Sequence, residues 1–152
     1  MKLERMTTHF QPQLEQEYKV YQLLMGEPGF AHAYQYSAEE EYNALVMEML
    51  GPSLETLFDA CGRIFSARTT LLLAPQMLTR LETLHRQTFI HRDQKPDNYC
   101  VGVGEHHGVI HLIDFGLVTR FVHHGHHIPY GERRAITGTV RYCSITAHLG
   151  VA

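Results

Sequence analysis

The spacing of apolar side chains predicts a helix near the start of the chain and a strand after it. In residues 13–25, QLEQEYKVYQLLM, apolar side chains recur at the spacing of one helix face, directly after a proline at position 12. This stripe consists of Leu14, Tyr18, Tyr21 and either Leu24 or Met25. The next residues, GEPGFAH, predict a loop. Residues 42–50, YNALVMEML, form an apolar run that ends at a Gly-Pro pair, so they predict a buried strand that leads into a turn.

Two serine residues mark the starts of further helices. Ser53 is a predicted N-cap for the short segment LETLFDA, and Ser66 is a predicted N-cap for a long helix that runs to about His85. One face of the long helix carries Leu71, Ala74, Leu78, Leu81 and His85. Pro75 lies inside this pattern, where it removes a backbone donor and clashes with the preceding turn. It predicts a kink or a cost of roughly 3 kcal/mol.

The second half of the chain predicts another strand and a long loop. Residues 109–115, VIHLIDF, have the composition of a strand, and a polar segment rich in His and Gly follows from Thr119 to about Thr139. Apart from HHGHH at residues 123–127, the chain contains no low-complexity tract and no internal repeat.

Composition and charge narrow the classes of function. The chain has 152 residues, of which 44% are hydrophobic and 19% are charged, which is typical of one globular domain. The formal net charge of -3 provides neither a basic surface for nucleic acid nor a polybasic segment for anionic membranes. The longest apolar run, around residues 71–74, is far too short for a membrane span, and no secretory leader opens the chain. We therefore expect neither nucleic acid nor membrane as a partner.

The positions of cysteine and histidine argue against a disulfide framework and a structural metal site. Cys61, Cys100 and Cys143 are odd in number, far apart and in no C-x-x-C spacing. The HHGHH tract could ligate a transition metal, but no acidic or thiolate ligand lies close to it in the sequence, so adventitious binding is the favoured interpretation. We expect a monomer in a reducing compartment, the cytoplasm and/or the nucleus.

Residues 90–98, IHRDQKPDN, and residues 114–116, DFG, contain the side chains that phosphoryl transfer needs. That reaction uses a carboxylate to orient the attacking hydroxyl and accept its proton, and a cation on the transferred group. It also uses an amide and a carboxylate to hold Mg²⁺ on the phosphates. The residues that match these roles, in that order, are Asp93, Lys95, Asn98 and Asp114.

Each of these motifs alone would be a turn more often than an active site. Both occur here in order, separated by a strand-length gap and preceded by a long helix, which favours the catalytic interpretation. H-R-D-L-x-x-x-N followed by D-F-G is the signature of protein kinases, and Gln94 is the one departure, at a position where an apolar residue is usual.

The chain resembles one group of protein kinases, the casein kinase 1 family. The segments that carry this resemblance are MKLE at 1–4, PQLEQE at 12–17, VMEMLGPSLETLF at 46–58, FIHRDQKPDN at 89–98, LIDFGL at 112–117 and HIPYGERRAITGTVRYCSITAHLG at 127–150. Together they cover nearly the whole chain. The last is the most specific, because most kinases have an A-P-E triplet in this region. The family has S-I-N-x-H-L-G instead, and this chain has SITAHLG.

The resemblance implies a nucleotide site and its cofactors. Lys2 resembles the strand-three lysine that holds the α- and β-phosphates, and Glu17 resembles its ion-pair partner on the neighbouring helix. Met47 resembles the gatekeeper, and the backbone of Glu48 and Leu50 resembles the hinge that hydrogen-bonds adenine. The expected cofactors are ATP and Mg²⁺.

The resemblance also implies a substrate class. Members of the family favour protein substrates that are acidic or already phosphorylated upstream of the target Ser or Thr. Arg134 and Arg141 match basic positions that would bind this anion, and Arg92 lies near them in the expected fold.

The expected fold is the α+β protein-kinase fold in a truncated form. It lacks the strands of the Gly-rich loop at the start and the later helices of the C-lobe. Residues 1–50 would form the remainder of the small lobe and the hinge, and residues 51–152 the first part of the helical lobe, with the catalytic loop and the activation segment. The expected function is that of a serine/threonine kinase. The alternative is a catalytically inactive fragment that acts as an interaction module or has no independent function, and only the enzyme requires Asp93.

Overall fold

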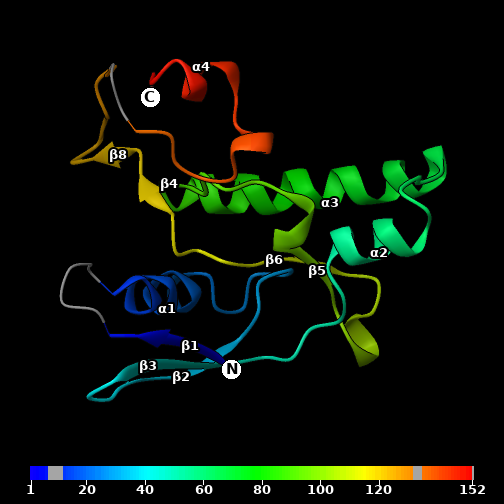
Figure 1. The fold of residues 1–152 in the computed structure, drawn as a ribbon, viewed down its shortest axis with the longest axis horizontal. Helices are drawn as coiled ribbons and strands as arrows, with labels where there is room; N and C mark the ends of the chain where they lie inside the picture. The colour runs from blue at the N-terminus through cyan, green and yellow to red at the C-terminus, as the bar shows by residue number, and fades with distance from the viewer. Residues whose placement is uncertain (7–11, 132–134, 152) are drawn as a thin grey trace.

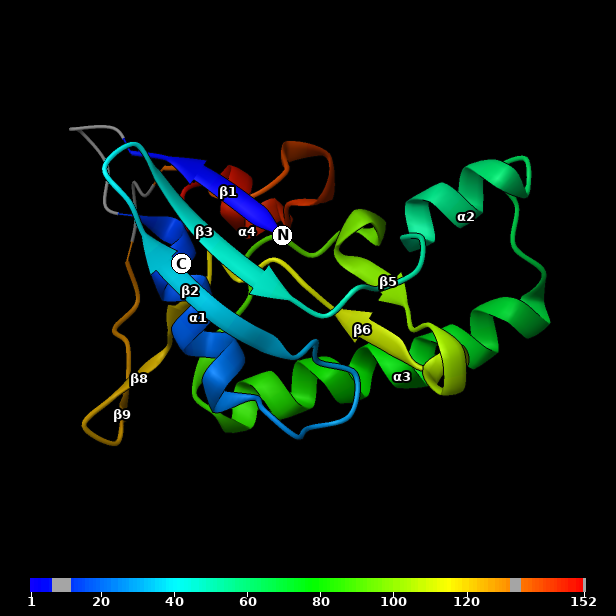
Figure 2. The same cartoon turned by 90° about the horizontal axis from the view of Figure 1, so that it is seen from below.

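A small antiparallel sheet and one helix form the first part of the fold. The computed structural model describes residues 1–6, 12–131 and 135–151. The three-stranded sheet has the order β1 (Lys2–Arg5), β3 (Tyr42–Met47) and β2 (Ala33–Ala38). Helix α1 (Gln13–Leu23) packs against β2 and β3 and lies between the sheet and the rest of the molecule (Figure 1). Figure 2 shows this layering from below, with the sheet in front of α1.

A side chain from β1 fixes the start of α1. The helix begins immediately after Pro12, as predicted, but the proline provides no side-chain cap. Instead the carboxylate of Glu4 accepts hydrogen bonds from the backbone N–H groups of Gln13 (2.9 Å) and Leu14 (3.3 Å). A negative charge at this end of a helix also complements the helix dipole. The contact therefore aligns β1 with α1.

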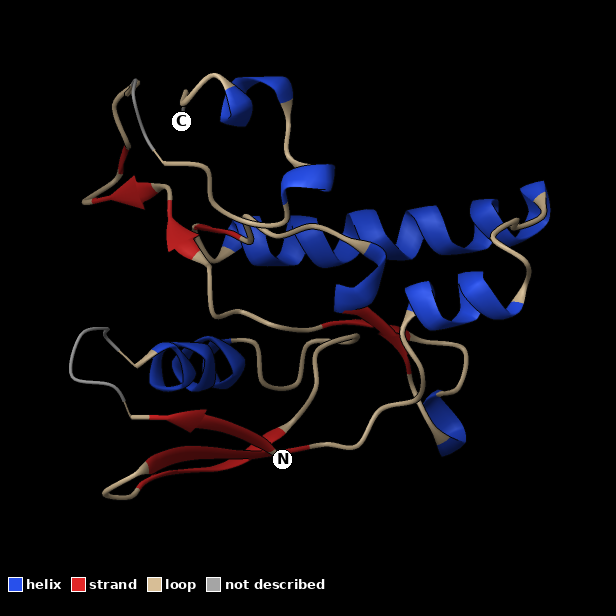
Figure 3. Ribbon diagram, in the orientation of Figure 1, coloured by secondary structure: helices blue, strands red, loops and turns tan. Residues whose placement is uncertain are grey.

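Helices dominate the second part of the fold, as Figure 3 shows. The α-helices are α2 (Leu54–Ala60), α3 (Ala67–Arg86) and α4 (Ile145–His148). Short antiparallel pairs join β4 (Phe89–Ile90) to β7 (Thr119–Arg120), β5 (Tyr99–Val101) to β6 (Ile110–Leu112), and β8 (Val122–His123) to β9 (His126–His127). In the described residues of this part there are also three 3₁₀ turns: η1 (Pro96–Asn98), η2 (Gly104–His106) and η3 (Val140–Tyr142). No helix in the described residues is both long and apolar enough to cross a membrane.

Both predicted serine caps are present. The Ser53 hydroxyl accepts a hydrogen bond from the backbone of Thr56, and the Ser66 hydroxyl accepts one from Thr69, at 3.2 and 3.0 Å. Helix α2 coincides with LETLFDA, and α3 extends one residue beyond the predicted end at His85. The helix assignment of α3 continues through Pro75.

The fold covers only part of the predicted apolar stripe of α3, where Leu81 packs against the core. Leu71 and Leu78 are 73% and 67% exposed, whereas the buried residues of the helix are Arg80, Thr83 and Leu84. The reason is that α3 packs on β4 and β6 with a neighbouring face. The Nε atom of Arg80 donates to the carbonyl of Ile110 in β6 at 3.0 Å, which fixes that orientation.

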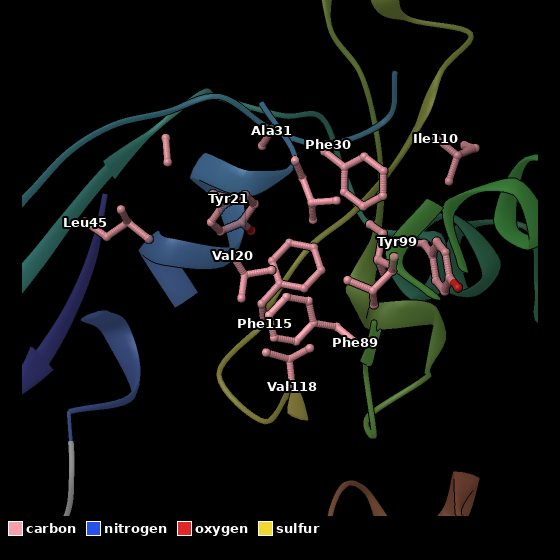
Figure 4. Packing of buried hydrophobic residues seen from close by; sticks show 14 of the residues in the cluster. Val20, Tyr21, Phe30, Ala31, Leu45, Phe89, Tyr99, Ile110, Phe115 and Val118 are labelled. Carbon is pink, nitrogen blue, oxygen red and sulfur yellow. The ribbon is translucent and has the colours of Figure 1, made fainter. Parts of the chain in front are cut away.

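One hydrophobic core connects the two parts of the molecule. Leu45 of β3, Tyr21 of α1 and Leu84 of α3 belong to the same buried cluster. Phe115, at 0% exposure, lies in the middle of it among side chains from both parts (Figure 4). The core therefore includes the central residue of the DFG segment, residues 114–116, and holds that segment in place.

Candidate active site

Two loops of the helical part meet at the side of that part that faces α1 (Figure 1). The catalytic loop, residues 91–98, follows β4, and the DFG segment follows β6. The backbone N–H of Ile113 donates to the carbonyl of Asn98 at 2.9 Å, so the end of one loop is tied to the start of the other. Polar side chains separated widely in sequence are thereby brought into one region.

Lys2 links the sheet, α1 and the DFG segment. Its Nζ lies 2.7 Å from a carboxylate oxygen of Glu17 and 3.1 Å from Oδ1 of Asp114. Burial alone would lower the pKa of Lys2, but the carboxylates of Glu17 and Asp114 outweigh it and raise that pKa above its usual value. Burial raises the pKa of Glu17, which is 2% exposed, and the Lys2 ammonium offsets only part of this effect. The charged ammonium of Lys2 is thus held beside the carboxylate of Asp114, whose side chain is 43% exposed.

Asp93 is the centre of a second network. Its Oδ1 accepts the backbone N–H of Thr139 at 2.7 Å, and its Oδ2 lies 2.7 Å from Nζ of Lys95. Nζ of Lys95 also donates to the hydroxyl of Thr139 at 2.9 Å. Burial alone would raise the pKa of Asp93, but the hydrogen bonds from Lys95 and Thr139 hold it below its usual value. The carboxylate is therefore ionised at neutral pH and oriented by its contacts with Lys95 and the backbone of Thr139.

The buried ring of His91 supports the catalytic loop. Its Nδ1 accepts the backbone N–H of Asp93 at 3.3 Å, and its Nε2 lies 3.1 Å from the carbonyl of Ile113. These contacts fit a neutral ring with the proton on Nε2, and burial lowers the pKa of His91 accordingly. The ring therefore connects the catalytic loop to Ile113, the residue between β6 and Asp114.

Close approach of two backbone segments completes the site. Arg92 and Asp114 adopt left-handed backbone conformations, with φ of 68° and 69°, and Gly138 has φ of 93°. A Cβ atom on Gly138 would lie 2.3 Å from the carbonyl oxygen of Arg92. Only glycine therefore allows the segment before Thr139 to reach the catalytic loop.

Asn98 and Asp114 carry oxygen atoms that suit a hard divalent cation as ligands. The Nδ2 of Asn98 donates to the backbone carbonyl of Asp93 at 2.8 Å, which leaves Oδ1 as the atom that can act as a ligand. Asn98 Oδ1 and the Asp114 carboxylate are oxygen ligands of the kind that Mg²⁺ prefers. The residues present therefore fit a magnesium ion.

The histidine tract, residues 123–127, lies in a β-hairpin. His123 lies opposite His126 across β8 and β9, and His124 and Gly125 form the turn. Within the described residues, no group of three or more His, Cys, Asp or Glu side chains converges as a metal-ligand set.

The predicted adenine-binding segment follows β3. Met47 and Leu50 are half-buried at this junction. The backbone N–H of Glu48 donates to the carbonyl of His32 at 2.7 Å. Within the described residues, the carbonyl of Glu48 and the N–H of Leu50 have no hydrogen-bond partner. One backbone acceptor and one donor are therefore available to a ligand here.

The structure describes one of the two predicted substrate-binding arginines. Arg134 lies outside the described residues. Arg141 is exposed on η3, with its guanidinium carbon 5.3 Å from the centre of the Tyr142 ring. Its described contacts are with neither Asp93 nor Lys95.

Sequence reasoning did not assign roles to several residues that build this geometry. Thr139 and Gly138 belong to the segment quoted at 127–150, where a Gly before a Thr could have indicated a tight approach. His91 was part of the motif without a role of its own. Tyr21 was predicted only as a residue of the apolar stripe, since no sequence pattern indicates the contact of its hydroxyl.

Comparison with protein families agrees with this arrangement. Residues 1–145 match the family model described as the protein kinase domain. The match contains the catalytic loop, the DFG segment and the Lys2–Glu17 ion pair. The chain has a mixed α+β kinase-like fold, and it belongs to the protein kinase domain family.

Proposed function

We propose that this chain is a serine/threonine protein kinase of the casein kinase 1 type. It transfers the γ-phosphoryl group of ATP to Ser or Thr side chains of acidic or pre-phosphorylated proteins. The observation that carries the proposal is the network of Asp93, Lys95 and Thr139, which fixes one ionised carboxylate at 2.7 Å from a lysine ammonium. This pair supplies the base and the cation that phosphoryl transfer requires.

The residues divide the reaction between them. Asp93 orients the substrate hydroxyl and accepts its proton as the oxygen attacks the γ-phosphorus, and the bond to the β-phosphate oxygen breaks. Lys95 contacts the transferred group and stabilises its negative charge, while Lys2, held by Glu17, contacts the α- and β-phosphates.

Asn98 and Asp114 would hold Mg²⁺, through Oδ1 of the amide and the exposed carboxylate. When bound, the metal neutralises charge that develops on the β- and γ-phosphates.

The end of β3 would bind the adenine ring. The free carbonyl of Glu48 can accept from the exocyclic amine of adenine, and the free N–H of Leu50 can donate to a ring nitrogen. Met47 limits the depth of the site as the gatekeeper.

A basic cavity supports the proposed preference for anionic substrates. It has a volume of about 640 Å³ and lies between α1 and the segment after DFG. Its described lining contains Lys19, Arg92, Arg120 and His123 and no Asp or Glu. Such a lining favours a phosphate or a cluster of carboxylates by charge-assisted hydrogen bonds. Arg134 and Arg141 remain proposed contributors from the segment that follows.

A transfer assay tests the proposal. The chain is incubated with Mg²⁺ and γ-labelled ATP and with peptides that carry a Ser preceded by acidic residues or by phosphoserine. We expect label on Ser, and a loss of roughly 100-fold or more in Asp93→Asn, because a general base contributes factors of this size. A neutral peptide of the same length is the substrate control. Equal transfer by wild type and Asp93→Asn would contradict the proposed mechanism.

The same assay separates the enzyme from a catalytically silent module. The module is the alternative because α3 exposes Leu71, Leu72 and Leu78, which a partner protein could cover. A module would bind peptides or proteins equally well with Asp93 or Asn at this position and would transfer no label.

A further inference from the structure

Tyr21 contacts the backbone of the proposed metal ligand. It lies on α1, one helical turn after Glu17 and on the same side of the helix, and it is 1% exposed. The backbone N–H of Asp114 donates a hydrogen bond to the phenolic oxygen of Tyr21 at 3.3 Å. The hydroxyl thus lies deep in the core but meets the residue whose side chain faces the nucleotide site.

Asp114 has a backbone conformation that needs support. Its φ of 69° is in the left-handed region, which residues with a Cβ atom avoid. Among the contacts of its polar atoms, Lys2 holds the carboxylate at 3.1 Å and Tyr21 holds the N–H. Helix α1 therefore acts on Asp114 at two points, through the Glu17–Lys2 ion pair and through the Tyr21 hydroxyl.

The Tyr21 ring has a separate role from its hydroxyl. The ring packs edge-on against Phe115, with centroids 4.8 Å apart and planes at 77°. The rings of Phe30 and His91 also pack against the Phe115 ring, with centroid distances of 6.2 and 5.6 Å. Figure 4 shows Tyr21 projecting from α1 toward Phe115. Removing only the hydroxyl would leave this packing in place, so the two roles can be measured separately.

We propose that Tyr21 is a positioning residue for metal–nucleotide binding. Its hydroxyl holds the backbone of Asp114 so that the carboxylate keeps the direction needed to bind a divalent cation. This inference rests on the proposed function and adds a residue to it. Burial raises the pKa of Tyr21 well above its usual value, so the phenol stays neutral throughout the pH range of the assay.

The test compares Tyr21→Phe with wild type and with Tyr18→Phe. Tyr18 is the matched control, because it lies on the same helix and its ring stacks on Tyr36 at 5.8 Å. Calorimetric titration gives the Kd of a non-hydrolysable ATP analogue, with Mg²⁺ and with a chelator. The quantity compared is the ratio of the metal-free Kd to the Mg²⁺ Kd.

In Tyr21→Phe we expect this ratio to fall by roughly 3- to 10-fold, the size of one lost hydrogen bond. The metal-free Kd should stay unchanged, and Tyr18→Phe should match wild type in both values. Because both Kd values come from the same folded sample, a general loss of stability leaves their ratio unaltered.

Each outcome decides the inference. A ratio in Tyr21→Phe equal to that of wild type overturns the positioning role while leaving the proposed function intact. A wild-type chain that binds the analogue neither with nor without Mg²⁺ overturns the proposed function, and the inference falls with it. A lowered ratio in Tyr18→Phe as well would also overturn the inference, since the effect would then belong to the helix and not to the hydroxyl.

Discussion

At the scale of single residues, the site depends on contacts that tolerate little change. Asp93 accepts from Lys95 in its own loop and from the backbone of Thr139, and the second contact depends on how closely two backbone segments approach. Gly138 and Asp93 therefore give the clearest predictions.

Gly138→Ala should disrupt the catalytic network. The new Cβ atom would lie 2.3 Å from the Arg92 carbonyl, so the segment must move and Thr139 must leave Asp93. We expect at least a 10-fold loss of phosphoryl transfer and a loss of about 1–3 kcal/mol in the free energy of unfolding. Gly125→Ala is the matched control, because Gly125 has φ of 79° but open space around it. Equal effects of the two substitutions on transfer would contradict the proposed role of the close approach.

Asp93→Asn should change how stability depends on pH. The folded-state pKa of Asp93 lies below its usual value of 3.8, so its ionised form contributes stability that is fully present above this pH. That contribution is lost as the pH falls through the folded-state pKa. Urea unfolding should therefore show wild type more stable than Asp93→Asn by about 2 kcal/mol at neutral pH, with a difference that shrinks in acid. A difference that stays constant down to about pH 3 would argue against an ionised, hydrogen-bonded Asp93.

The motif residues could be predicted because their spacing is distinctive. Asp93, Lys95, Asn98 and Asp114 were found from two short segments, and the structure brings these segments together. The hydroxyl of Tyr21 and the backbone N–H of Thr139 could not be predicted, because backbone contacts and buried hydroxyl contacts leave no residue pattern.

At the scale of elements, local signals determined most of the helix boundaries. Ser53 and Ser66 are effective predictors because a capping hydroxyl acts within one turn of its own helix. Strand β2 (Ala33–Ala38) was missed, since it is an exposed strand whose pairing with β3 includes an irregular register near Ala33. The loop predicted from residue 119 to 139 contains β7, β8 and β9, which are too short to show a pattern.

The sequence pattern predicted the wrong buried face for most of α3. Periodicity finds apolar faces but does not decide which face the rest of the fold covers. Leu71 and Leu78 made the predicted stripe apolar, yet the contact with Ile110 depends on Arg80, a charged residue that hydropathy assigns to the surface.

Pro75→Ala should stabilise α3. The proline leaves the carbonyl of Leu71 without its backbone donor, and the position is exposed, so an alanine methyl meets no crowding. Restoring the donor should raise the free energy of unfolding by about 1–2 kcal/mol, after the greater freedom of alanine in the unfolded chain is subtracted. Urea denaturation with an unchanged slope would measure the gain. No gain, or a loss, would show that the helix has adapted to the proline.

At the scale of the whole molecule, the two parts of the fold share both a core and a site. Phe115 packs against Tyr21 and Phe30 from the first part and against His91 from the second. Lys2 reaches from β1 to Asp114. Nucleotide binding should therefore stabilise the molecule as one unit, because the ligand would contact residues of both parts.

The most direct test of this account is a thermal unfolding measurement with and without Mg²⁺ and ATP. At a ligand concentration about 100-fold above Kd, binding adds about 2.7 kcal/mol, which for a chain of this size raises Tm by roughly 5–10 °C. We predict such a shift for wild type and a much smaller shift for Lys2→Met and for Asp114→Asn. A wild-type Tm that does not change with Mg²⁺ and ATP, or a shift equal in all three proteins, would contradict the account.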